Sequence, residues 1–191
     1  MKKINIPNND TKKKSYITTF TGIHFDPVNP DISLIDIRDI AHALSLICRG
    51  NGHVNNFYSV GQHCINAAKE AAARGYSKRV ILACLIHDAG ECYLSDVPRP
   101  FKQMLPEYIR AEDALLDFIY EKFLGSKLTA KEAALVKNID NDLLYYDLKF
   151  LLNEFLDTPA PQLTIELNYD FVPFIIVEQN YLELFDQYRL L

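Results

Sequence analysis

The chain has 191 residues, of which 49% are hydrophobic and 24% are charged, a composition that suits one globular domain with a sizeable core. Its formal net charge of -5 argues against a long nucleic acid as partner, although a small phosphorylated molecule needs only a local positive site. No stretch of the sequence has the length and apolarity of a membrane span, so we expect a cytoplasmic protein without a membrane partner.

The first residues divide into a polar tail and a short extended element. Residues 1–14 are basic and lack the apolar core of a secretory signal, which predicts a flexible, solvated tail rather than a nucleic-acid-binding arm. From Tyr16 to Phe25, β-branched and aromatic residues alternate around Gly22, a pattern that predicts a short hairpin or an extended arm.

Helical patterns begin after this element. Between Leu34 and Cys48, apolar residues recur at helical spacing. Ser59 and Gln62 then form a capping box at the start of a second helix, and His63 lies on the apolar stripe of that helix. We therefore expect the His63 side chain to point into the core.

The next helix is the most apolar segment of the chain. Ser77 is its predicted cap, and the run Val80 to Ile86 is apolar on every side, as expected for the central helix of a bundle. The pattern predicts that this helix continues into His87 and Asp88, where Gly90 allows the backbone to relax. An ionised carboxylate at the end of such a helix is costly unless a cation or a donor satisfies it.

The second half of the chain predicts three further helices. One runs from about Pro106 to Leu124 and is closed by a glycine, and Thr129 and Glu132 form the capping box of a long one. Residues 164–169 suit a short strand or an extended segment, and residues 173–191 suit a final amphipathic helix.

The cysteines give no sign of a disulfide framework. They never form a C-x-x-C pair, and each lies in a stretch with a helical pattern. We therefore expect reduced thiols in the core. The four residues are Cys48, Cys64, Cys84 and Cys92.

Three predicted helices each direct a potential metal ligand inward. His63 and Asp140 interrupt otherwise apolar stripes, and the His87-Asp88 pair ends the apolar helix. Two imidazoles and two carboxylates suit one divalent cation, such as Mn²⁺, Co²⁺, Fe²⁺, Zn²⁺ or, less well, Mg²⁺, with positions left for water. Asp147, seven residues after Asp140, faces the same side and competes with it for this place, as does Asp142.

The motifs that contain these residues resemble a known family. SVGQH ends at His63, LIHDAGE surrounds His87 and Asp88, and VKNID ends at Asp140. This order of His, His-Asp and Asp on successive helices resembles the HD-domain superfamily of metal-dependent phosphohydrolases, and is most similar to small bacterial 5'-deoxynucleotidases and phage nucleotide hydrolases. The resemblance spans about residues 49–152 and implies an all-α helical bundle, a single domain over residues 1–191, with these four residues as the metal ligands.

The resemblance also implies roles around the metal. Glu91 and Asp96, in HDAGECYLSDVPRPFK, match the catalytic residues that position water and substrate in that group. Arg49 matches an arginine that contacts the substrate phosphate, and Lys102 closes the proline-rich loop. His53, in the GNGH loop, is a further candidate for substrate binding at the mouth of the site.

The implied reaction is hydrolysis of a phosphate ester or anhydride of a nucleotide, above all a (deoxy)nucleoside 5'-monophosphate. A metal ion serves this reaction because it makes hydroxide available near neutral pH and offsets charge on a phosphoryl oxygen. Two alternatives remain open at this point, a (deoxy)nucleoside triphosphohydrolase and a nucleotide-binding or metal-stabilised interaction protein without turnover.

Gly50 stands where the family has an aromatic residue, which leaves the base preference open. Homo-oligomers are common in this group, and the sequence leaves the assembly state open.

Overall fold

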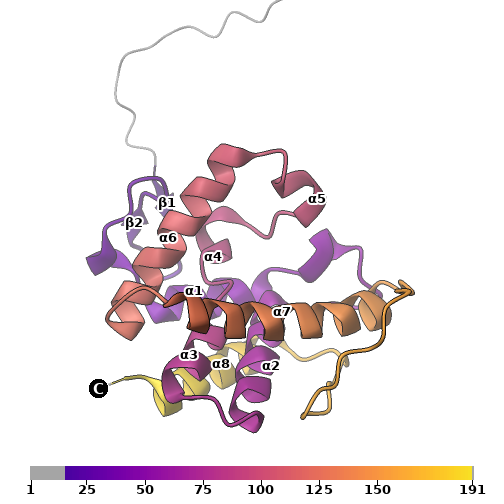
Figure 1. The fold of residues 1–191 in the computed structure, drawn as a ribbon. Helices are drawn as coiled ribbons and strands as arrows, with labels where there is room; N and C mark the ends of the chain where they lie inside the picture. Colours follow the sequence, from indigo (N-terminus) through magenta and orange to yellow (C-terminus); the bar gives the residue numbers. More distant parts are fainter. Residues whose placement is uncertain (1–15, 191) are drawn as a thin grey trace, which may run out of the picture.

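A computed structural model describes residues 16–190 of the chain, and the predicted tail at residues 1–14 lies outside this range. Within the described residues, eight α-helices form a bundle, accompanied by a two-stranded sheet and two short 3-10 turns (Figure 1). The predicted all-α fold is therefore confirmed. None of the helices in this range is long and apolar enough to cross a lipid bilayer.

The predicted N-terminal hairpin is present. Strand β1 (Ile17–Thr18) pairs antiparallel with β2 (His24–Phe25), and Gly22 adopts a φ of 83° in the turn between them. The Thr21 backbone N–H and hydroxyl both donate to the Asp39 carboxylate, at 2.7 and 2.9 Å. These bonds attach the hairpin to the first helix of the bundle.

The first two long helices begin at side-chain caps. Helix α1 (Ile37–Leu46) begins after Asp36, whose carboxylate accepts from Arg38 N–H; it is shorter than predicted because η1 (Ile32–Leu34) is a separate 3-10 turn. A second 3-10 turn, η2 (Arg49–Gly52), connects α1 to α2 (Val60–Ala73). The predicted capping box at the start of α2 is confirmed, since the Ser59 and Gln62 side chains each bond to the backbone of the other.

The apolar helix ends earlier than predicted. Helix α3 (Lys78–Leu85) begins at its Ser77 cap, but Ile86 leaves the helical region with φ -105° and ψ 13°. His87 and Asp88 therefore lie in a turn and not in the helix. Two one-turn helices follow this turn, α4 (Glu91–Leu94) and α5 (Arg99–Lys102).

The remaining helices agree closely with prediction. Helix α6 (Pro106–Leu124) ends at Gly125, which adopts a left-handed φ of 78°. Helix α7 (Ala130–Leu151) begins at the predicted Thr129 and Glu132 capping box. Residues 164–169 form neither strand nor helix, and α8 (Phe174–Tyr188) is the predicted last helix.

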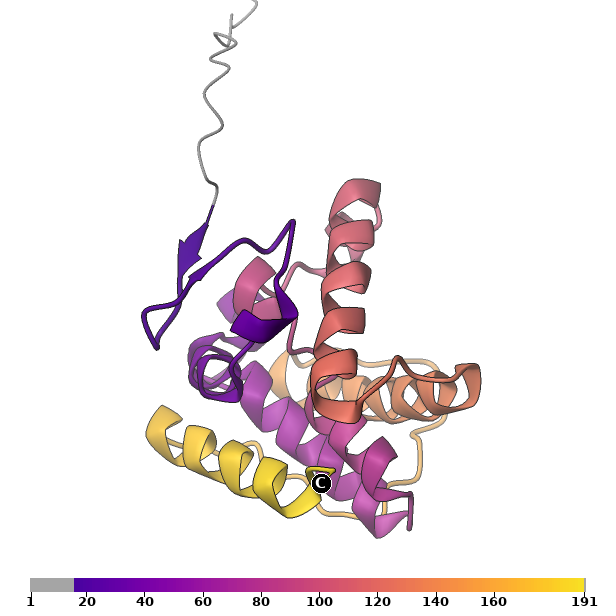
Figure 2. The same cartoon turned by 90° about the vertical axis from the view of Figure 1, so that its left-hand side faces the viewer.

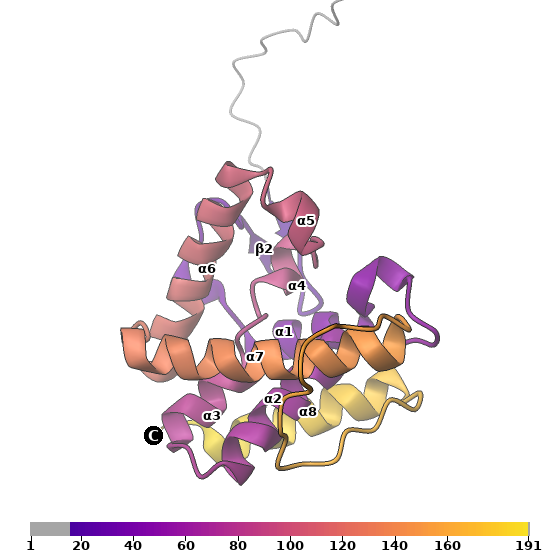
Figure 3. The same cartoon turned by 45° about the vertical axis from the view of Figure 1, so that its right-hand side comes forward.

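Helix α2 is at the centre of the bundle, in contact with α1, α3, α7 and α8. Figure 2 shows α8 alongside α1 and α2, and Figure 3 shows α7 crossing the bundle in front of α2 and α3. Every residue from Val80 to Ile86 is buried, as predicted, and burial of each large aliphatic side chain contributes about 1.5 to 3 kcal/mol. Cys64 and Cys84 are buried free thiols, whereas Cys48 and Cys92 are half-buried and also free.

Candidate metal centre

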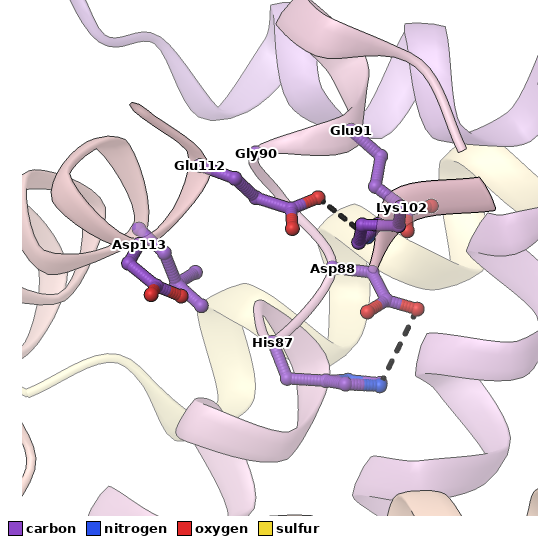
Figure 4. A pocket seen from close by; sticks show the side chains of 8 residues that line it. His87, Asp88, Gly90, Glu91, Lys102, Glu112 and Asp113 are labelled. Carbon is purple, nitrogen blue, oxygen red and sulfur yellow. Dashed lines mark hydrogen bonds and ion pairs between the residues drawn. The ribbon is translucent and has the colours of Figure 1, made fainter. Parts of the chain in front are cut away.

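The predicted ligands meet where α2, the turn after α3 and α7 face one another. His63 lies in the first turn of α2 and is 1% exposed, and Asp140 lies near the middle of α7. His87 and Asp88 come from the turn that follows α3, and Figure 4 shows their side chains directed toward each other. The early end of α3 allows these two adjacent residues to converge, which neighbouring helical residues, about 100° apart, would not do.

The distances fit ligands of one ion. Nε2 of His87 is 3.4 Å from Asp88 Oδ2 and 3.7 Å from Asp140 Oδ1. Nε2 of His63 is 3.2 Å from Asp140 Oδ1 and 4.0 Å from Asp88 Oδ2. Two atoms that each lie about 2.1 Å from one ion are about 3 to 4.2 Å apart, depending on the angle between them at the ion. Ligand atoms of His63, His87 and Asp88 lie within 4.8 Å of one another and can hold a metal ion.

Hydrogen bonds determine which nitrogen of each imidazole faces the centre. Nδ1 of His87 lies 2.7 Å from the Cys84 carbonyl oxygen, which only accepts, so this nitrogen carries a proton. Nδ1 of His63 donates in the same way to Asp147 Oδ2, at 2.9 Å. In the neutral imidazoles, both Nε2 lone pairs therefore point at the carboxylates. His87 Nε2 is buried and has no hydrogen-bond partner in the described part of the chain, an arrangement that a bound cation would satisfy.

Asp147 has a supporting role that the sequence did not distinguish from a ligand role. Besides His63, it accepts from Arg49 Nη2 at 3.4 Å and from the Tyr169 hydroxyl at 3.0 Å. Arg49 also donates from Nη1 to Asp88 Oδ2, at 3.3 Å. Asp147 thus orients the imidazole of His63 and also the guanidinium of Arg49, which contacts Asp88. Burial raises the pKa of Asp147, but the bond to His63 and the nearby positive charges outweigh burial and lower it.

The other competitor is occupied elsewhere. Asp142 Oδ2 accepts from Arg74 Nη2 at 2.8 Å, outside the centre. Asp140 directs Oδ1 to His63, and its Oδ2 accepts from Lys137 Nζ at 2.6 Å. Asp140 can therefore offer one oxygen to an ion while the other is held by a lysine.

The imidazoles and carboxylates of the centre shift one another's pKa. Burial raises the pKa of Asp140, but the bond to His63 and the two imidazoles hold it below its usual range. Burial and Arg49 lower the pKa of His63, but its bonds to Asp140 and Asp147 outweigh them and raise it. Without a metal, protons on the imidazoles thus balance the carboxylates, and a metal would have to displace them.

A pocket of about 100 Å³ opens beside the centre. Figure 4 shows its lining, in which Lys102 Nζ donates to Glu112 Oε1 at 2.7 Å. The pocket is lined by His87, Asp88, Gly90, Glu91, Lys102, Glu112, Asp113 and Leu116. Glu91 is 6% exposed, and its Oε2 has no hydrogen-bond partner among residues 16–190. Its pKa is raised well above the usual range because the group is buried and because Asp88 and Asp96 lie nearby.

The predicted substrate and catalytic residues are only partly brought together. Arg49 contacts the centre, and Glu91 and Lys102 line the pocket. Asp96 is half-buried and outside the pocket lining, although its charge acts on Glu91. His53 is exposed at the end of η2, and within residues 16–190 no hydrogen bond or ion pair links its side chain to the centre.

Comparison with known proteins gives two relatives and no function. The chain is 41% identical over 111 residues to the Uncharacterized protein YfdR of Escherichia coli strain K12, a match that covers 57% of this chain and 58% of YfdR. It is 32% identical over 117 residues to the Uncharacterized protein RCAP_rcc00048 of Rhodobacter capsulatus, covering 58% of this chain and 59% of that protein. The match thus spans less than two thirds of each relative. No family model matches the chain.

Glu112 and Asp113 of α6 were not among the predicted site residues. Both line the pocket, yet neither interrupts an apolar stripe nor belongs to a recognisable motif. Asp147 could have been assigned from its spacing, because a residue seven positions after a ligand on a helix faces the same side two turns away.

Proposed function

We propose that this chain is a metal-dependent phosphohydrolase that acts on nucleotides and releases phosphate from (deoxy)nucleoside 5'-monophosphates. The observation that carries the proposal is the pair of buried imidazoles, His63 and His87. Their Nδ1 protons are held by Asp147 and by the Cys84 carbonyl, so that both Nε2 atoms face carboxylates of other residues. Buried polar groups arranged in this way are typical of a cation site with outer-shell support.

Membership of the HD-domain superfamily is part of the proposal. The His, His-Asp and Asp residues occur in the order of that superfamily and come from separate elements of an all-α bundle, with Asp140 in contact with both imidazoles. The resemblance of the motifs and the convergence of the side chains are independent observations, because sequence order alone does not bring His63 and Asp140 to 3.2 Å.

The donor set indicates which ions suit the centre. His63, His87, Asp88 and Asp140 offer two nitrogens and at least two oxygens, which suits Mn²⁺, Co²⁺, Fe²⁺ or Zn²⁺ better than an ion that prefers oxygen alone. When bound, a divalent cation supplies an activated water near neutral pH and offsets negative charge on a phosphoryl oxygen.

The basic residues of the chain would hold the phosphate. The Arg49 guanidinium uses two of its nitrogens on Asp88 and Asp147, which places a buried positive charge at the edge of the centre. Lys102 lines the pocket together with Asp88 (Figure 4). Positive groups that are already in place when the substrate arrives stabilise charge that develops on the phosphoryl oxygens.

Glu91 is the group best suited to hold and transfer a proton. Burial and the nearby Asp88 and Asp96 raise its pKa well above the usual range, which favours the protonated form, and no residue of the described range bonds to its Oε2. A protonated, buried carboxyl beside the phosphate can donate to the leaving oxygen or orient the attacking water. Asp96 contributes by its negative charge, which helps to keep this proton in place.

The size of the pocket supports attack on a terminal phosphate. A volume of about 100 Å³ admits a phosphoryl group but is smaller than the roughly 300 to 1,000 Å³ of sites that enclose a whole small molecule. The nucleoside would thus lie at the mouth of the pocket. Substrates with one phosphate fit this arrangement directly.

A screen of nucleoside mono-, di- and triphosphates against Mn²⁺, Co²⁺, Mg²⁺ and Zn²⁺ tests the proposal. We expect orthophosphate from 5'-monophosphates with at least one of these ions and no release with chelator. Tripolyphosphate from a triphosphate would instead identify a triphosphohydrolase. Tight nucleotide binding without hydrolysis under any ion would contradict enzymatic activity and favour a binding protein.

A further inference from the structure

Glu112 and Lys102 form the strongest contact across the pocket. Lys102 Nζ lies 2.7 Å from Glu112 Oε1, and the two side chains are only 23% and 16% exposed. Lys102 is the last residue of the one-turn helix α5, whereas Glu112 belongs to the 19-residue helix α6. The ion pair thus connects the short helix α5 to the much longer helix α6.

A second residue of α6, Tyr108, lies against both members of this ion pair. The Tyr108 hydroxyl donates to the Ser95 carbonyl oxygen at 2.8 Å and lies 3.4 Å from Glu112 Oε1, and the Lys102 ammonium is 5.6 Å from the centre of the Tyr108 ring. A single helical turn is not stable by itself, so the position of α5 depends on such contacts. Glu112 and Tyr108 therefore determine where the Lys102 ammonium lies.

The geometry points to Glu112 as a positioning residue, one that holds the Lys102 ammonium at the pocket so that it binds a phosphate oxygen of the substrate. This inference rests on the proposed function, because it takes the ligand to be a phosphate ester. Glu112 acts through Lys102 and does not itself contact the phosphate.

The donors of lysine make this compatible with simultaneous binding. An ammonium group has three N–H donors, and the bond to Glu112 uses one of them. Two donors remain for phosphate oxygens, so the ion pair does not have to break when the anion enters. Because the ion pair already restrains the lysine, less side-chain entropy is lost when the anion binds.

Because Glu112 is negatively charged, the direction in which phosphate affinity changes on its substitution tests the inference. A carboxylate near an anion site repels the anion, so its removal alone would tighten phosphate binding. Asp113 is the matched control, since it is the next residue of α6 and lines the same pocket, but it is exposed and its side chain forms no hydrogen bond or ion pair within residues 16–190. If the substitutions at Glu112 and Asp113 change phosphate affinity in opposite directions, the effect at Glu112 comes from the positioning of Lys102 and not from the loss of a negative charge.

The experiment measures the affinity of the Mn²⁺-loaded protein for inorganic phosphate by calorimetry. We expect Glu112→Gln to weaken phosphate binding about tenfold, and Asp113→Asn to leave it unchanged or to tighten it up to about threefold. In a Lys102→Met background, Glu112→Gln should leave phosphate binding unchanged or tighten it. Tighter binding in Glu112→Gln, or a tenfold loss that persists without Lys102, would overturn the inference.

Amide hydrogen exchange separates this inference from the proposed function. Glu112→Gln should speed exchange in residues 99–104 at least fivefold while α7 is unchanged, and Asp113→Asn should not. Unchanged exchange in Glu112→Gln would show that the ion pair does not hold α5, whatever the substrate. A protein that shows the exchange effect and binds phosphate but hydrolyses no nucleotide would contradict only the proposed function.

Discussion

The two sides of the pocket are built in different ways. On the inner side, the candidate metal centre of His63, His87, Asp88 and Asp140 is supported by long helices, buried side chains and hydrogen bonds that fix each imidazole. On the outer side, the α5–α6 rim of Lys102, Tyr108 and Glu112 depends on one ion pair and a one-turn helix. Under the proposed function, the fold preorganises ion binding, whereas phosphate binding depends on a few polar contacts.

The largest expected effect is loss of the centre itself. Asp88→Ala removes a ligand and a partner of Arg49, so we expect loss of bound metal and at least a 1,000-fold loss of phosphatase activity, an order of magnitude typical for a group that acts on transition-state charge. Metal analysis and a nucleotidase assay measure these effects. Helical circular dichroism should survive, because Asp88 lies in a turn outside the helices. Unchanged turnover in this variant would contradict the site.

A smaller effect is expected when the support of the centre is removed and its ligands are kept. Asp147→Asn leaves a side chain of the same size but weakens the bonds to His63 and Arg49, so metal affinity should fall about 10- to 100-fold. Competition with a metal indicator measures this change. Asp142→Asn is the control, because Asp142 bonds to Arg74 away from the centre, and an equal loss in both variants would rule out a specific role for Asp147.

The sequence predicted the inner side better than the rim. Capping boxes at Ser59 and Thr129 and the apolar stripes fixed where α2 and α7 begin and which faces they bury, so His63 and Asp140 could be placed in advance. The turn at His87 was missed because the apolar run masks the point where Ile86 leaves the helix. Glu112 could not be predicted, because its role depends on how α6 packs over α5 and no local pattern records that packing.

The pH dependence of metal binding is a further test of the candidate metal centre. The raised pKa of His63 means that its imidazole keeps a proton to higher pH than usual, whereas the lowered pKa of Asp140 keeps that carboxylate ionised. Because a metal binds only the neutral imidazole, its apparent affinity should rise with pH through and above the ordinary histidine range near 6.5, by up to about tenfold per pH unit for each proton released. Titrations from pH 5.5 to 8.5 measure the slope, and a flat profile would contradict proton displacement.

The smallest effect on the centre is expected from a change in core packing. A methyl group added at Gly61 would lie 3.1 Å from Val177 Cγ1 and 3.2 Å from the Leu44 backbone. Gly61→Ala should therefore lower the free energy of unfolding by about 1 to 3 kcal/mol, as overpacking does. Urea denaturation measures the loss. Metal affinity should stay within about threefold of wild type, and a larger change would show that the centre is less rigidly held than its hydrogen bonds indicate.

Anomalous diffraction from crystals grown with Mn²⁺ or Zn²⁺ tests the central claim most directly. The account predicts an anomalous peak about 2.0 to 2.2 Å from Nε2 of both His63 and His87, with oxygens of Asp88 and Asp140 completing the ligand set. A peak elsewhere in the molecule, or a fully loaded crystal in which these two imidazoles bind no ion, would contradict it.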